Sequence, residues 1–81
     1  MINFDVYRVP GESEKLLLVQ RPEGKEMVFN TTATTLAEGI EAYNHGALIQ
    51  DAFPFLSPDE REFLMTGITP SEWNEMFGKE Q

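Results

Sequence analysis

The sequence contains no cysteine and a single histidine, His45. Without cysteine, neither a disulfide framework nor a thiolate metal site can form. One histidine also excludes the usual zinc sites and histidine-based catalytic groups, although carboxylates could still bind calcium or magnesium. Neither an EF-hand loop nor a glycine-rich phosphate-binding motif is present. We therefore predict no cofactor and no metal.

Long apolar segments are also missing. No apolar run approaches the ~18–20 residues that a membrane-spanning helix needs. Residues 1–5 lack the basic stretch and the apolar core of a secretory signal. We therefore expect a cytoplasmic protein with no membrane partner.

Basic side chains are scarce, because 6 Lys and Arg residues stand against 14 Asp and Glu residues, giving a formal net charge of −8. Non-specific nucleic-acid binding depends on Lys and Arg replacing counterions on phosphate, so direct binding to nucleic acid is not expected. Residues 1–30 carry a net charge of −1, whereas residues 31–81 carry −7. A hydrophobic fraction of 41% argues against a disordered chain.

The first third of the chain has the pattern of a β-meander. Ile2, Phe4 and Val6 alternate with polar residues and indicate a half-buried strand. Residues 16–19 form a short apolar run between turn segments and indicate a second strand, and residues 27–30 are consistent with a third. We predict an antiparallel meander of two or three strands within residues 1–30.

Helix-start motifs dominate the rest of the chain. Thr35 with Glu38 fits a capping box and predicts a helix that ends near Gly46. Residues 48–53 can form a further short helix. Ser57-Pro58-Asp59-Glu60 and Thr69-Pro70-Ser71-Glu72 both combine a capping hydroxyl, a proline at the first helical position and a glutamate three residues on.

These patterns predict an α+β fold in one domain, residues 1–81. It would comprise the small antiparallel meander (1–30), a part with three or four short helices (34–78) and a free tail (79–81). We expect the core to contain the apolar residues on the inner faces of these elements: Ile2, Phe4, Val6, Leu16, Leu18, Phe29, Leu36, Ile40, Tyr43, Leu48, Phe53, Phe63, Leu64, Trp73 and Phe77. As a core residue, Trp73 would cost ~3–5 kcal/mol of stability on truncation to alanine.

Catalytic candidates are weak, and we predict that the protein is not an enzyme. Acidic residues such as Asp59 and Glu60 suit the first turn of a helix, where the macrodipole favours negative charge. His45 suits a helix C-terminus, because the macrodipole favours positive charge there. No cysteine is available as its nucleophilic partner. An enzyme or a small-molecule-binding protein that uses Glu62 or His45 in a pocket is a third hypothesis.

An interface is a stronger prediction. The segment Phe53-Pro54-Phe55-Leu56 cannot be regular helix throughout, so it can leave an apolar side chain exposed beside an acidic helical surface. The acidic residues can instead serve solubility, dock on a basic protein, or mimic the phosphates of a nucleic acid. We predict that the residues in contact with a partner are Phe53, Phe55, Asp59, Glu60, Glu62, Glu72 and Glu75.

Residues 48–73 resemble a pattern in small acidic accessory proteins encoded by bacteriophages. The pattern is Ile-Gln-x-x-Phe-Pro from Ile49, Arg-Glu-x-Leu from Arg61, Gly67-Ile68 and then Trp73. The resemblance implies phage or prophage origin, hence the host cytosol, but no activity. Some members carry cysteines at the start of the last helix, where this chain has Thr69 and Ser71, so no metal site is implied.

The first functional hypothesis is a non-enzymatic phage-type binding protein. It would dock its acidic half on a basic surface of a host protein and inhibit a factor that handles nucleic acid or acts in defence. The alternative is a structural or assembly protein that self-associates as a homo-oligomer or attaches to a virion component.

Overall fold

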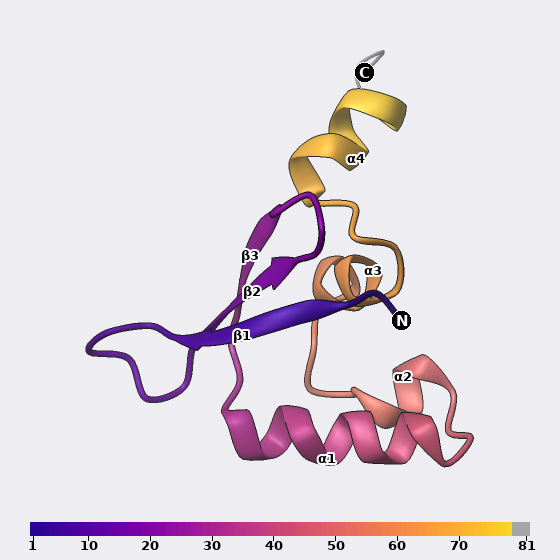
Figure 1. Cartoon of the computed structure of the whole chain (residues 1–81). Coiled ribbons are helices and arrows are strands. Elements are labelled where there is room, and N and C mark those ends of the chain that lie inside the picture. Colours follow the sequence, from indigo (N-terminus) through magenta and orange to yellow (C-terminus); the bar gives the residue numbers. More distant parts are fainter. Residues whose placement is uncertain (79–81) are drawn as a thin grey trace.

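The computed structural model describes residues 1–78, so the free tail predicted at 79–81 lies outside the described residues. A three-stranded antiparallel sheet comes first and four helices follow, which confirms the α+β fold class (Figure 1). The elements are β1 (Phe4–Arg8), β2 (Leu16–Gln20), β3 (Glu26–Phe29), α1 (Ala33–Asn44), α2 (Ile49–Ala52), α3 (Pro58–Thr66) and α4 (Pro70–Phe77).

The sheet has the order β1-β2-β3, so β2 is its central strand. Leu18 pairs with Val6 on one side and with Met27 on the other, and it is fully buried. Because side chains alternate along a strand, the next row of the sheet points to the opposite face. Tyr7 and Val28 lie in that row and are about half exposed. The sheet therefore has one covered face and one open face.

The core lies between the sheet and the helices. Its largest fully buried side chains come from β2, β3, the end of α2 and α3: Phe29, Phe53, Phe63, Leu18 and Leu64. The rings of Phe29 and Phe63 meet edge to face with their centroids 6.0 Å apart, which joins β3 to α3. Leu16 and Leu36 complete the buried positions that the sequence correctly predicts.

Four predicted core residues are exposed, and these predictions were wrong. Val6 lies on the edge strand β1, where no further strand covers it. Leu48 lies just before α2 and is the N-cap of that helix. Trp73 and Phe77 lie on α4, which contains no buried residue at all.

The helix α1 begins three residues earlier than the predicted capping box. Thr32 is its N-cap, and the Thr32 hydroxyl accepts a hydrogen bond from the backbone N–H of Thr35 at 3.1 Å. Thr35 is therefore already inside the helix, because Thr32 offers an equivalent capping oxygen one turn earlier. The chain leaves α1 through Gly46, whose φ of 103° is in the left-handed region, as the sequence predicts.

Both proline-containing capping boxes are confirmed at the starts of α3 and α4. Between these two helices the chain turns at Gly67, which has φ 78° and ends α3 in the left-handed conformation. After this turn α4 extends away from the core and lies beside the β2–β3 turn (Figure 1).

Candidate partner-binding surface on α3 and α4

The structure separates the two phenylalanines that were predicted to anchor a partner. Phe53 is fully buried, so its prediction as a contact residue was wrong. Its ring packs under α1 at Gly39, where an added Cβ would lie only 2.5 Å from ring carbons of Phe53. Phe55 is 39% exposed and meets Phe53 edge to face at a centroid distance of 6.0 Å.

Glu60 is also internal, and its prediction as a contact residue was wrong. It is only 5% exposed and forms the capping box of α3, in which Oε1 accepts from the backbone N–H of Ser57 at 2.8 Å. Its second carboxylate oxygen accepts from the backbone N–H of Asn30 at 3.0 Å. Glu60 therefore ties the start of α3 to the end of β3 and is a structural residue.

Glu72 has a partner within the chain as well. Its Oε1 accepts from the backbone N–H of Thr69 at 3.0 Å, and its Oε2 lies 2.9 Å from the ammonium of Lys25. The Thr69 N–H, followed by Lys25, lowers the pKa of the Glu72 carboxyl. In turn, the hydrogen bond to Glu72 is the largest of the causes that raise the pKa of Lys25. Glu72 thus fastens α4 to the β2–β3 turn.

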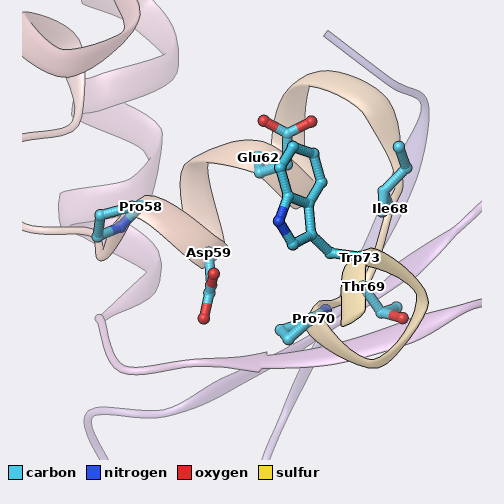
Figure 2. A pocket seen from close by; sticks show the side chains of 7 residues that line it. All are labelled: Pro58, Asp59, Glu62, Ile68, Thr69, Pro70 and Trp73. Carbon is cyan, nitrogen blue, oxygen red and sulfur yellow. The ribbon is translucent and has the colours of Figure 1, made fainter. Parts of the chain in front are cut away.

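Asp59 and Glu62 are brought together with Trp73 in a pocket between α3 and α4. This α3–α4 pocket has a volume of about 240 Å³ and is lined by Pro58, Asp59, Glu62, Ile68, Thr69, Pro70 and Trp73. In the view of Figure 2, Asp59 and Pro58 project on one side of the indole ring of Trp73 and Ile68 on the other. Phe55 does not line it.

The α4 face, defined here as Trp73, Met76 and Phe77, was not predicted as a contact surface. These residues are 45%, 54% and 54% exposed, and they follow the i, i+3, i+4 spacing of one helical face. The ring centroids of Trp73 and Phe77 lie 4.5 Å apart. The same spacing is typical of a helix that packs on a core, so the sequence offered no signal that this face stays open.

The helices α3 and α4 together carry five acidic side chains and one basic side chain. Within residues 1–78, no Lys or Arg side chain forms an ion pair with Asp59, Glu62 or the exposed Glu75. The basic residue of α3, Arg61, donates from Nη1 to the backbone oxygens of Phe53 and Leu56 at 3.1 and 2.7 Å. It is therefore engaged with the α2–α3 connection.

Of the two residues named for the third hypothesis, Glu62 lines the α3–α4 pocket and His45 does not. His45 lies exposed at the end of α1, with Nδ1 2.9 Å from the backbone oxygen of Glu41. Among residues 1–78 no group of three His, Asp or Glu side chains is placed to hold a metal ion. None of the four helices there is long and apolar enough to cross a membrane.

Comparisons with known proteins found no protein-family model, no curated protein and no solved structure that matches this chain. The surface on α3 and α4 therefore has to be interpreted from its own chemistry.

Proposed function

We propose that this protein is a non-enzymatic binding protein that docks α3 and α4 on a basic surface of another protein. The observation that carries the proposal is the exposure of Trp73, Met76 and Phe77 together on one face of α4. Aromatic residues and methionine are enriched at protein interfaces. Exposed apolar residues gathered in one place mark interaction sites far more often than scattered ones do.

Charge supports a basic partner. Asp59, Glu62 and Glu75 belong to the same two helices, and complementary charge accelerates association and improves selectivity. Basic surfaces are typical of proteins that bind nucleic acid. The partner class in this proposal is therefore a nucleic-acid-handling or defence protein of a bacterial host, which a phage-encoded protein would inhibit by covering its basic surface.

A second candidate function is assembly, in which the α4 face self-associates or attaches to a virion component. The apolar character of the α4 face favours it. The net charge of −8 works against a dimer of identical acidic surfaces, because like charges repel, most strongly at low salt. Light scattering at micromolar concentration separates the two, because assembly predicts a discrete oligomer of the pure protein.

Affinity capture from a bacterial extract tests the first function when it compares matched variants. A double variant, Met76→Ser with Phe77→Ser, alters the α4 face. The control, Tyr7→Ser with Val28→Ser, alters residues of similar exposure on the open face of the sheet. We expect the wild type and the control variant to capture a basic protein that the α4 variant does not capture. Raised salt should release this protein from both. Identical capture by all three proteins would contradict the proposal.

A further inference from the structure

The α3–α4 pocket has a chemistry more specific than the surface around it. Its walls combine the flat indole of Trp73 with the apolar side chains of Ile68, Pro58 and Pro70. Two carboxylates, from Asp59 and Glu62, lie at the same pocket. A ligand that enters it would meet an apolar aromatic surface and negative charge at once (Figure 2).

Hydrogen-bond acceptors outnumber donors in this pocket. Pro58 and Pro70 have no backbone N–H to donate. The backbone N–H groups of Ile68 and Thr69 are already used, the first by the Thr66 hydroxyl at 3.2 Å and the second by Glu72 at 3.0 Å. The remaining donors are the indole N–H, the Thr69 hydroxyl and the first-turn backbone N–H of Asp59. A group rich in N–H donors fits this lining, and an anion does not.

The Glu62 carboxylate is held in position on the surface of α3. The hydroxyl oxygen of Thr66 lies 3.1 Å from Oε2 of Glu62 and 2.9 Å from the Glu62 backbone oxygen, so its one proton can be donated to either. The other carboxylate oxygen, Oε1, has no hydrogen-bond donor within residues 1–78. Glu62 can therefore accept from a ligand without giving up a contact in the chain.

Among positively charged groups, arginine suits the pocket better than lysine. A guanidinium is planar, so it can stack on an indole face while its N–H groups point sideways to carboxylates. It is also more weakly hydrated than an ammonium, which reduces the cost of moving it against apolar walls. Bidentate contacts between arginine and a carboxylate are also among the strongest hydrogen-bonded pairs in proteins.

We propose that the α3–α4 pocket receives an arginine side chain of the partner, stacked on Trp73 and donating to Glu62. This inference rests on the proposed function and specifies the partner as one with an arginine flanked by apolar residues, which would contact the neighbouring Met76 and Phe77. A second copy of this chain is a poorer occupant, because two chains of charge −8 repel each other.

The test uses capped heptapeptides with a central arginine between apolar residues, and matched peptides with citrulline or lysine in its place. Trp73 is the only tryptophan of the chain, so its fluorescence and its indole N–H signal in NMR spectra report on the pocket directly. We expect the arginine peptide to shift the indole N–H signal and the citrulline and lysine peptides to bind at least about fivefold more weakly. Glu62→Gln should weaken the arginine peptide by a similar factor, whereas Glu14→Gln, an exposed carboxylate in the β1–β2 connection, should not.

Equal binding of the arginine and citrulline peptides, or of the arginine and lysine peptides, would overturn the inference. So would an indole N–H signal that moves when only the concentration of the pure protein is raised, because a second copy of the chain would then occupy the pocket. If the pocket fails in this way while the Met76 and Phe77 variant still loses its captured partner, the binding function stands without an arginine site. If both experiments fail, the binding function fails with it.

Discussion

The ammonium of Lys25 lies 2.9 Å from a carboxylate oxygen of Glu72, and this ion pair joins the β2–β3 turn to the first turn of α4. Lys25 and Glu72 are 47 positions apart in the sequence, and α4 itself contains no buried residue. The orientation of the α4 face therefore depends on Glu72, which both caps α4 and holds it to the sheet. Lys25 contacts Glu23 as well, at 3.2 Å.

The Glu72–Lys25 pair predicts a specific pH dependence. Because folding lowers the pKa of Glu72, this group stabilises the fold above its unfolded pKa of about 4.3 and the contribution is lost as the pH falls through the lower folded value. Folding raises the pKa of Lys25, so its contribution is present below about pH 10.4 and is lost as the pH rises through the folded value. An NMR titration of the Glu72 carboxyl carbon measures the acid limb.

In Lys25→Ala we expect the pKa of Glu72 to rise only part of the way to its ordinary value. The Thr69 backbone N–H, the largest cause of the lowered pKa, still donates to Glu72 in that variant. Lys15→Ala, which removes an exposed lysine from the other end of the sheet, should leave the pKa of Glu72 where it is. Equal effects of the two substitutions would show that Lys25 does not hold α4.

Glu60→Ala should destabilise the fold, although Glu60 was first expected on a binding surface. The substitution leaves the backbone N–H groups of Asn30 and Ser57 without their acceptors, and each such loss typically costs about 1–3 kcal/mol. Glu60→Gln keeps one acceptor oxygen and should cost less. Urea denaturation measures both values. A loss for Glu60→Ala no larger than that of an exposed control such as Glu14→Ala would contradict the structural role.

Gly39→Ala should lower stability even though alanine favours helices by about 1 kcal/mol over glycine. The new methyl group would meet the Phe53 ring at 2.5 Å and the Ala52 backbone oxygen at 2.9 Å, and overpacking of this kind typically costs about 1–3 kcal/mol. Thermal unfolding followed by circular dichroism gives the sign. A more stable Gly39→Ala protein would mean that α1 and Phe53 are not in close contact.

Truncation of one aromatic residue in the core and one on the α4 face should destabilise the fold by different amounts. Phe63→Ala removes a fully buried ring and should cost about 3–5 kcal/mol. Trp73→Ala removes a ring that is 45% exposed and contacts Phe77, so about 1 kcal/mol is expected instead of the value for a core residue. Chemical denaturation of both variants compares them. Similar losses for the two would place Trp73 in the core after all.

The features that the sequence predicts correctly are local ones. The Ser57–Glu60 and Thr69–Glu72 capping boxes close within three residues, and each is reinforced by a proline at the first helical position. The Thr35–Glu38 pattern has no such proline, and Thr32 caps α1 in its place. The three strands follow in the same way from short apolar runs between turns. The fold class could therefore be predicted from local patterns alone.

The features that the sequence misses depend on tertiary placement. Glu60 looks like any acidic residue in a first turn, and only the folded chain brings Asn30, thirty positions away, within 3.0 Å of its carboxylate. Phe53 and Phe55 are equivalent in sequence, but only Phe53 points under α1. The apolar spacing of Trp73 and Phe77 fits a buried helix equally well, and the turn at Gly67 decides that α4 lies outside the core.

The most direct test of the central claim is the rate at which hydrogen peroxide oxidises Met76, measured by mass spectrometry with and without bacterial extract. Met76 is 54% exposed on the α4 face, and Met1, 39% exposed at the other end of the chain, is the internal control. Methionine oxidation follows exposure, so docking on α4 should slow the oxidation of Met76 and not of Met1, and raised salt should restore the rate. Unchanged oxidation of Met76 in the extract would contradict the account, and protection that grows with the concentration of the pure protein would show self-association instead.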